Sequence, residues 1–204
     1  LGIINSEEFE NRANIAAKVA DRLGLVGVPA VRSETASSTG AAAFHEACYK
    51  IRAGAAENVL VLAGERMKTV TTQVATEIMS KTVDPVEKRF GCTMPALIAL
   101  LSQSFFNRHG IRGERVADVL SRLMFRAHAL GSDNPLAAFA GKPESLAAYF
   151  DASRNLPVAT PLRRKDCSPI CDGAAALILT SRPQAVRVAG LGAATDTSSL
   201  VDRE

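Results

Sequence analysis

Residues 33–43 read SETASSTGAAA and lie between two apolar runs, VPAV at residues 28–31 and VLVLAG at residues 59–64. Both runs have the length of a strand, and residues 39–53 between them have the apolar spacing of a helix. The run at 59–64 is continuously apolar, as in strands of parallel sheets that helices cover on both faces. Residues 28–64 therefore predict a strand–helix–strand unit with a right-handed crossover, and the fold class is α/β.

Apolar spacing predicts further elements on both sides of this unit. Helices are expected over residues 11–23, 94–108 and 114–130, a short helix is expected to start at Pro143, and strands are expected over 174–180 and 186–191. Residues 65–91 and 131–143 predict irregular structure, and residues 155–173 predict a connector rich in proline and arginine. The order of elements predicts an α/β core that is interrupted by a helical, lid-like insertion.

Small polar residues fill the turn at 33–43, directly before the predicted helix at 39–53. A side chain at such a turn meets the free N–H groups and the positive dipole end of the helix, which favour a thiolate or an oxyanion. Capping is the simpler alternative, because Ser and Thr are among the commonest residues that cap a helix. The turn is no Gly-x-Ser-x-Gly elbow, since no glycine lies two positions before Ser37.

Length and charge exclude several classes of protein. The 204 residues are 47% hydrophobic and carry 24 Lys and Arg against 21 Asp and Glu, a net charge of +3, which argues for a folded core and against disorder. No apolar run approaches the roughly 20 residues of a membrane-spanning helix. The basic residues are scattered, so we expect no nucleic-acid partner. The one short basic run, at residues 163–165, is explained by a solvated loop.

The four cysteines, Cys48, Cys92, Cys167 and Cys171, include no pair with Cys-x-x-Cys spacing, and the three histidines lie far apart. We therefore expect no metal site and no disulfide framework, and we expect a reduced, cytoplasmic protein. The chain begins at Leu1, within what reads as the end of a strand, and stops in a polar segment at residues 201–204. These ends lead us to expect a piece of a larger protein.

Three ordered motifs resemble the thiolase family. The first is the segment that carries the nucleophile in thiolases, with ETASSTG at residues 34–40, IRAG at 51–54 and AGERM at 63–67. The second, DCSPICDGAAA at 166–176, resembles the return from the loop domain to the core sheet. The third is ATD at 194–196, and Asn134, Pro135 and Phe139 resemble the insertion loop. Together they are similar to thiolases of the sterol-carrier-protein type and their bacterial and archaeal relatives.

The resemblance implies a layered αβαβα fold of two similar halves, of which this chain would supply the first half together with a helical loop-domain insertion. It places an N-terminal core at residues 1–91, the loop domain at 92–165, and the return to the core at 166–204, with the start of the second half missing. Thiolases bind coenzyme A with the loop domain, and basic residues suit its phosphates. The candidates, each with the alternative of an ordinary surface residue, are Arg126, His128, Arg163, Arg164 and Lys165.

Two departures from the family pattern bear on catalysis. The nucleophilic cysteine of the family falls on Ser37, whose hydroxyl needs a strong adjacent base, and His45 is two helical turns further on. The histidine motifs that supply the other catalytic groups in thiolases do not occur in this chain. Cys167 and Cys171 are expected to be unreactive, because nothing nearby in the sequence lowers a thiol pKa, and the resemblance implies a structural role at the first of these positions.

Three functions remain open. The first is a thiolase-type acyltransferase in lipid metabolism, a homodimer or homotetramer that takes an acyl-CoA as substrate and carries no covalently bound cofactor. It would cleave 3-oxoacyl-CoA or condense acetyl-CoA, with Ser37 at the nucleophile position. The second is a thiolase-like aldolase that acts on hydroxyacyl-CoA with a small zinc-ribbon/OB-fold partner and needs no acyl-enzyme. The third is a noncatalytic thiolase-like subunit that scaffolds an active partner.

Overall fold

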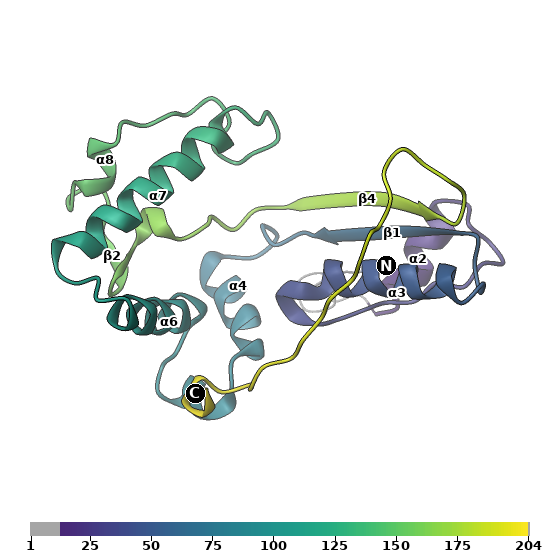
Figure 1. Cartoon of the computed structure of the whole chain (residues 1–204), viewed down its shortest axis with the longest axis horizontal. Coiled ribbons are helices and arrows are strands. Elements are labelled where there is room, and N and C mark those ends of the chain that lie inside the picture. Colours follow the sequence, from purple (N-terminus) through teal and green to yellow (C-terminus); the bar gives the residue numbers. More distant parts are fainter. Residues whose placement is uncertain (1–12, 204) are drawn as a thin grey trace. The chain divides into compact units, whose positions relative to one another are not determined.

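The computed structural model describes residues 13–203, and the chain divides into two compact units. The first unit combines Leu1–Thr82 with Ile170–Asp196, and the second combines Val83–Pro169 with Thr197–Glu204. Figure 1 shows helices together with strands along the described part of the chain. The strand end expected at residues 1–4 lies outside the described residues.

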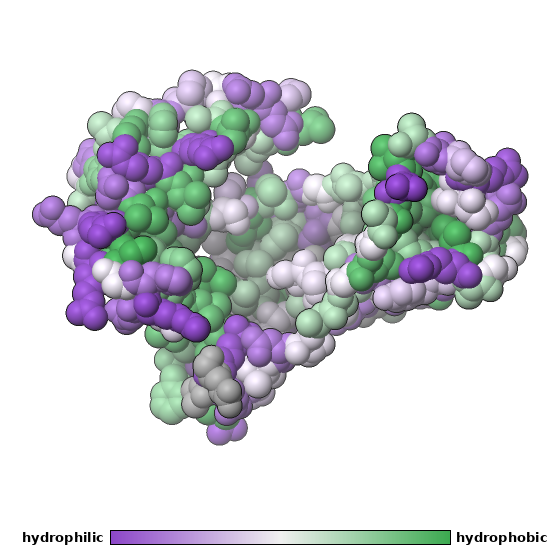
Figure 2. Space-filling view, viewed as in Figure 1, coloured by the Kyte–Doolittle hydropathy of each residue, from purple (hydrophilic) through white to green (hydrophobic). Residues whose placement is uncertain are grey.

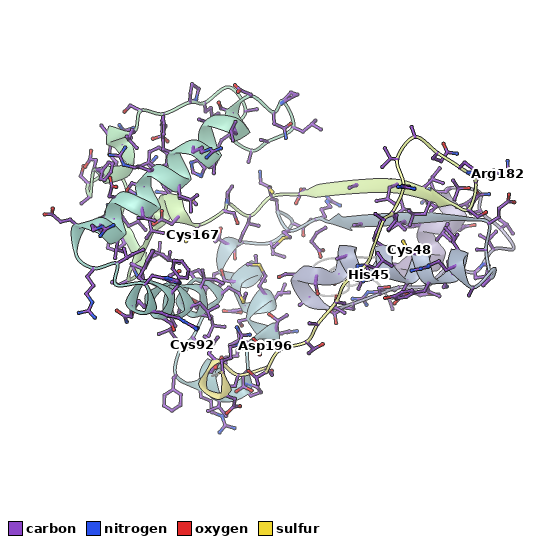
Figure 3. All side chains as sticks on the ribbon, viewed as in Figure 1. His45, Cys48, Cys92, Cys167, Arg182 and Asp196 are labelled. Carbon is purple, nitrogen blue, oxygen red and sulfur yellow. The ribbon has the colours of Figure 1, made fainter. Side chains whose placement is uncertain are left out.

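Two antiparallel strands form the sheet of the first unit. β1 (Asn58–Glu65) pairs with β4 (Gly173–Thr180) over its whole length, and Val59 lies opposite Leu179 in the register. Beyond one end of the ladder, the guanidinium of Arg182, labelled in Figure 3, donates to the carboxylate of Glu57 at 2.7 Å. At the other end, the Lys68 N–H donates to a carboxylate oxygen of Asp172 at 2.8 Å. Both ends of this two-stranded ladder are therefore tied by contacts between the flanking segments.

Helix α3 (Thr39–Arg52) packs on β1 in the same unit (Figure 1). Its buried residues Ala43 and Ala47 form an apolar cluster with Val61 of β1. Alanine side chains are small, so the helix backbone approaches the strand closely. Two residues after the helix ends, Gly54 has φ +70°. The N–H groups of Gly54 and of the next residue donate to carbonyls of the last helical turn, which is the pattern of a Schellman C-cap.

The described part of the first unit is completed by α2 (Ile15–Arg22), α4 (Thr72–Met79) and the 3-10 turns η1 (Ala36–Ser38) and η2 (Ser80–Thr82). The side chain of Thr71 caps α4 by accepting a hydrogen bond from the Val74 N–H. Ala75 and Ile78 of α4 are buried, and the side chains that pack on them are Met67, Val70 and Ile170.

The second unit is mainly helical. It contains α5 (Pro85–Arg89), α6 (Met94–Arg108), α7 (Glu114–Ser132) and α8 (Ala147–Phe150), the short strands β2 (Pro157–Ala159) and β3 (Leu162–Arg163), and the 3-10 turns η3 (Arg164–Asp166) and η4 (Leu200–Asp202). Tyr149 is 1% exposed and packs edge to face on Phe125 of α7. Figure 2 shows apolar residues reaching the surface between charged ones, and those exposed on α6 are Ile98, Leu100, Leu101 and Phe105.

Several predicted elements are confirmed. The helices expected over 39–53, 94–108 and 114–130 and the strand expected over 174–180 are α3, α6, α7 and β4. The helix expected over 11–23 is α2, although it begins only at Ile15 among the described residues. Residues 133–143 form turns, as expected, and the short helix expected from Pro143 begins four residues later, at Ala147.

The predicted parallel strand–helix–strand unit at residues 28–64 is wrong. Residues 28–31 form no strand, and β1 pairs with β4 in the antiparallel direction. Pro29 has no N–H to donate to a ladder, and Val28 and Val31 are exposed. The apolar run at 59–64 predicted a strand correctly, but a continuous apolar pattern does not determine the direction of its partner.

Three other expectations are also corrected. Residues 65–91 are not irregular, because they contain α4 and α5. Helix α5 begins with Pro85 in its first turn and with Asp84 as a side-chain cap, which accepts from the Val86 N–H at 2.8 Å. The strand expected over 186–191 does not form, and Val186 is exposed. The connector at 155–173 contains β2, β3 and η3.

Candidate active site at the start of helix α3

Ser37 lies in η1, the single 3-10 turn that leads directly into α3. Ala36, directly before it, has φ +52°, in the left-handed region that non-glycine residues rarely adopt. The carboxylate of Glu34 accepts the Ala36 N–H at 2.7 Å. The hydroxyl of Ser38 lies 2.8 Å from the Thr35 carbonyl oxygen, to which it donates. Side chains on both sides of Ser37 therefore hold the turn in this conformation.

The capping alternative can be compared with the observed contacts. Ser38 directly precedes α3, and its side chain makes no capping hydrogen bond to the helix. Thr35, which precedes η1, also makes no side-chain cap. The Ser37 side chain is exposed, and within residues 13–203 its hydroxyl has no hydrogen-bond partner. The serines and threonines of this turn thus fix the turn itself and leave the Ser37 hydroxyl available to a ligand.

The start of α3 has the electrostatics of an anion site. A helix of 14 residues carries a partial positive charge at its N-terminus, where the first N–H groups lack carbonyl partners within the helix. A base for the Ser37 hydroxyl is not found in the same turn. His45 lies further along α3 (Figure 3), where its ring contacts Phe44 and Tyr49. The Thr39 N–H donates to the Ala36 carbonyl and the Ser38 N–H to the Thr35 carbonyl, so the positive helix dipole is the main feature that favours an anion here, and within the described residues no base contacts Ser37.

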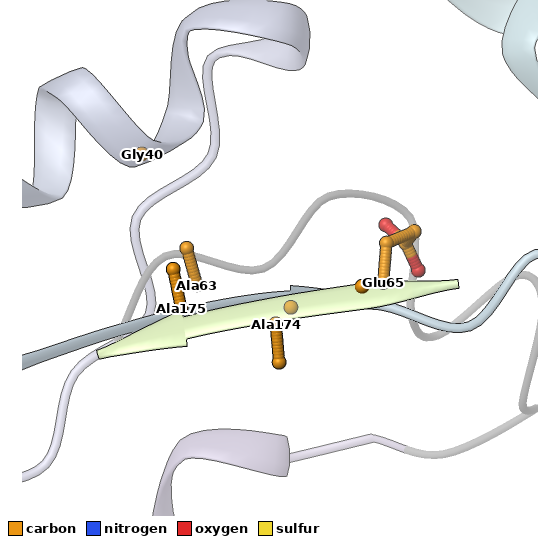
Figure 4. A pocket seen from close by; sticks show the side chains of 7 residues that line it. Gly40, Ala63, Glu65, Ala174 and Ala175 are labelled. Carbon is orange, nitrogen blue, oxygen red and sulfur yellow. The ribbon is translucent and has the colours of Figure 1, made fainter. Parts of the chain in front are cut away.

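A pocket of about 360 Å³ lies beside the first turn of α3 (Figure 4). Its lining residues all belong to the first unit and are almost all glycine or alanine: Gly40, Ala63, Gly64, Glu65, Gly173, Ala174 and Ala175. A Cβ atom on Gly64 would lie 3.3 Å from the Cβ of Ala174, so a side chain there would press on the neighbouring strand. The small residues keep open the space next to the candidate site.

Tyr149 gathers three of the predicted coenzyme A-binding residues in the second unit. Its hydroxyl lies 2.8 Å from Nδ1 of His128, and the Lys165 ammonium lies 5.2 Å from the centre of its ring. The guanidinium of Arg163 donates to the Tyr149 carbonyl at 3.4 Å. Arg126 and Arg164, also predicted, are exposed and make no such contact within the described chain. Sequence reasoning missed Tyr149, and no sequence pattern marks it, because a tyrosine in a four-residue helix has no distinctive spacing.

Burial and charge shift the pKa values around this cluster. Burial raises the pKa of Tyr149, and the nearby carboxylate of Glu144 raises it further, so the phenol stays protonated. A hydrogen bond from Lys165 lowers the pKa of Glu144. Burial raises the pKa of Asp166 although its carboxylate accepts the Arg163 N–H at 2.7 Å. The cluster therefore holds a neutral phenol next to His128 and an ion pair at its edge.

The four cysteines form no disulfide bond. All four thiols are free, and Cys48 on α3 is buried. Burial raises the pKa of Cys167, and the charge of Asp166 raises it further, so this thiol has little thiolate character. Within residues 13–203 no three side chains of His, Cys, Asp and Glu are placed to hold a metal ion. None of the helices in this part of the chain is long and apolar enough to span a membrane.

Comparison with known proteins identifies the family. Residues 1–140 match the family model of the thiolase N-terminal domain. The chain belongs to the thiolase family. The α/β, thiolase-like fold class expected from the motifs is confirmed by this match together with the mixed helix and strand content. The division into core and loop domain at residues 91 and 165 stays a prediction.

Relatives with assigned names align along most or all of the chain. An acetyl-CoA acetyltransferase of Methanocaldococcus jannaschii is 32% identical over 214 residues, which cover 100% of this chain and 52% of the relative. An acetyl-CoA acetyltransferase of Methanothermobacter thermautotrophicus is 29% identical over 210 residues, with the same coverage of both chains. Sterol carrier protein 2 of Bos taurus is 27% identical over 197 residues, which cover 87% of this chain and 34% of that protein. The chain thus spans about half the length of the two archaeal relatives.

Proposed function

We propose that the protein is a thiolase-type acyltransferase that uses a coenzyme A thioester as substrate and needs no covalently bound cofactor. One observation carries the proposal: a chain of the thiolase family presents the exposed Ser37 hydroxyl, without a hydrogen-bond partner in the described residues, at the start of a long helix. Two relatives that align along the whole chain are named acetyl-CoA acetyltransferase, which supports acetyl-CoA and 3-oxoacyl-CoA as the class of substrate.

In the proposed cleavage of acetoacetyl-CoA, the Ser37 oxygen attacks the 3-oxo carbon. An oxygen–carbon bond forms and the bond between C2 and C3 breaks, so the acetyl group becomes an ester on Ser37 and the enolate of acetyl-CoA leaves. The hydroxyl proton passes to a base outside the described turn, the enolate carbon takes up a proton, and the thiol of coenzyme A then takes the acetyl group from Ser37. The N–H groups at the start of α3 would stabilise the oxyanion that develops on the carbonyl. A serine makes this step slower than a cysteine, because its hydroxyl is hardly ionised at neutral pH.

The second unit would bind coenzyme A. His128, Arg163 and Lys165 surround Tyr149 and offer two fixed cations and an imidazole, while Arg126 and Arg164 add exposed charges. Cations suit the phosphates of coenzyme A. We further propose a cytoplasmic homodimer or homotetramer that acts in lipid metabolism.

Turnover of acetoacetyl-CoA with coenzyme A tests the proposal in the full-length protein. We expect the wild type to turn over slowly, Ser37→Ala to lose activity by a factor of 100 or more, on the order of losses seen when a nucleophile is removed, and Ser37→Cys to gain activity. Equal rates for the wild type and Ser37→Ala would reject Ser37 as the acyl acceptor.

One observation favours a second candidate, a thiolase-like aldolase with a small zinc-ribbon/OB-fold partner. No base contacts the Ser37 hydroxyl among the described residues, and carbon–carbon cleavage of a 3-hydroxyacyl-CoA needs no acyl-enzyme. The aldolase predicts that Ser37→Ala still cleaves a 3-hydroxyacyl-CoA at a rate close to that of the wild type. Loss of this cleavage in Ser37→Ala would reject it.

A further inference from the structure

The hydroxyl of Thr39 bridges the two residues that determine how Ser37 is presented. It accepts the Thr35 N–H at 2.9 Å and donates to the Ala36 carbonyl at 2.7 Å. Thr39 is completely buried, with 0% of its surface exposed. The Thr39 hydroxyl therefore uses its proton and one of its lone pairs in hydrogen bonds to the backbone. One partner is the N–H of a residue before Ser37, and the other is the carbonyl of the residue directly next to Ser37.

The bridged segment needs such support. Ala36 holds φ +52° without the freedom of glycine, and a left-handed residue of this kind costs roughly 1–2 kcal/mol relative to an ordinary conformation. Glu34 accepts the Ala36 N–H from the exposed side of the turn, and the Thr39 hydroxyl donates to the Ala36 carbonyl on the buried side. Because the peptide groups on both sides of Ala36 are held, the conformation that determines the direction of the Ser37 side chain is fixed.

We propose that Thr39 is a positioning residue for the group at position 37, an inference that rests on the proposed function for the chemistry it serves. Thr39 does not touch the acyl group. It holds the backbone of residues 35 and 36, and with it the direction in which the side chain at position 37 leaves the turn before α3. Threonine suits this role because its hydroxyl, when it bonds a carbonyl three residues earlier in a helix, locks its own side-chain rotamer.

A purely structural role for Thr39 must be distinguished from positioning. A matched control exists in the same unit: the Thr76 hydroxyl on α4 donates to the Thr72 carbonyl at 2.8 Å, far from position 37 in the sequence. Thr39→Val and Thr76→Val remove the same chemical group, although the buried Thr39 hydroxyl makes two hydrogen bonds and the less buried Thr76 hydroxyl makes one. Both variants should therefore lose stability, whereas loss of positioning changes the reactivity of the group at position 37 in the first variant only.

The test uses two measurements on the full-length protein. The first is turnover of acetoacetyl-CoA with coenzyme A, separated into kcat and KM. The second uses the Ser37→Cys background, where the rate of alkylation by iodoacetamide at position 37, followed on the peptide by mass spectrometry from pH 5 to about pH 9, reports the thiol pKa. A thiol at a helix N-terminus has a pKa below its free value of about 8.5, and that depression depends on its direction.

We expect Thr39→Val to lower kcat by about 10- to 100-fold with little change in KM, a loss on the order of that caused by a small misplacement of a reacting group. In the Ser37→Cys background, it should raise the pH midpoint of alkylation, and Thr39→Ser should restore both values. Thr39→Ala, which cannot overpack the site, serves as the second variant. Equal behaviour of Thr39→Val and Thr76→Val in both measurements would overturn the inference. A further outcome separates this inference from the proposed function. If no variant shows turnover, but Thr39→Val still shifts the alkylation midpoint and Thr39→Ser restores it, acyl transfer would be rejected and positioning supported.

Discussion

The hydroxyl of Tyr149 lies 2.8 Å from Nδ1 of His128, and this contact joins α8 to α7 within the second unit. The carbonyl of the same tyrosine accepts hydrogen bonds from Asn155 at 2.9 Å and from Ser121 at 3.3 Å. Asn155 in turn accepts the Lys165 N–H at 2.8 Å. Tyr149 thus connects the long helix α7 with the segment that carries three of the predicted coenzyme A-binding residues.

Replacement of Tyr149 by phenylalanine should destabilise the second unit. The variant removes the hydroxyl and leaves Nδ1 of His128 without this partner, so the free energy of unfolding should fall by about 1 kcal/mol, measured by urea denaturation. Tyr49→Phe is the matched control, because Tyr49 is the only other tyrosine in the chain and is more than half exposed. It should change stability by less than about 0.5 kcal/mol. An equal effect of both variants would show that the His128 contact contributes nothing.

The two carboxylates beside this cluster should give pH dependences of opposite sign. Burial raises the pKa of Asp166, so the folded state binds the proton of this carboxyl group more tightly than the unfolded state does. The contribution of Asp166 to stability is therefore lost as pH rises through the folded pKa. Glu144 has a pKa lowered by Lys165, so its contribution is present above the ordinary value of about 4.3 and is lost as pH falls. Asp166→Asn should therefore make stability rise more steeply with pH in the acid range, and Glu144→Gln should make it rise less steeply. Denaturation midpoints at a series of pH values measure this, and equal slopes in the two variants would contradict the assignment.

The left-handed conformation of Ala36 predicts a substitution that stabilises the protein. Glycine adopts φ +52° without the steric cost of a Cβ atom, so Ala36→Gly should raise the free energy of unfolding by up to about 1 kcal/mol after the entropy cost of glycine is subtracted. Ala41→Gly is the matched control, since Ala41 is an exposed residue inside α3. It should lower stability by about 1 kcal/mol. Thermal unfolding compares them, and a loss of stability in both variants would show that position 36 is not strained.

The sequence predicted best those elements whose apolar spacing is long and regular. The helices α3, α6 and α7 have 14, 15 and 19 residues, so several apolar residues fall on the same face of each helix and make the pattern recognisable. Helix α5 has only five residues, and no periodic pattern can be recognised over that length. The signals that mark it are local, namely the cap at Asp84 and the proline that follows it, and a search for caps would have found them.

Strand pairing was the part that the sequence did not determine. A run such as residues 59–64 predicts a strand but carries no sign of its partner or direction, and β4 lies more than 100 residues further along the chain. The burial expected on both faces is also not seen, because only Val61 of β1 is buried in the described structure. The absence of a strand at residues 28–31 has the same cause, because an extended segment becomes a strand only when another strand pairs with it. The isolated bridge at Ser33 is the sole strand-like residue in the described segment 28–35.

For the candidate site, the sequence predicted the position of Ser37 before α3 but not the contacts that hold it. From their spacing alone, the small polar residues in the turn favoured side-chain capping over a nucleophile. The bridge made by Thr39 and the left-handed Ala36 depend on backbone conformation, which the residue types alone do not specify, because alanine rarely adopts it. In the second unit, His128 and Lys165 were predicted separately as coenzyme A-binding residues, and their meeting point at Tyr149 follows from the packing of α7, α8 and η3.

The central claim is that position 37 accepts the acyl group. In the most direct measurement, the full-length protein is incubated with acetoacetyl-CoA and the reaction is stopped in acid within seconds. The mass of the peptide that contains position 37 is then measured by mass spectrometry. The account predicts an acetyl group on Ser37 in the wild type, no adduct on this peptide in Ser37→Ala, and a more abundant thioester adduct in Ser37→Cys. Turnover without any adduct on Ser37, at the same rate in the wild type and in Ser37→Ala, would contradict it.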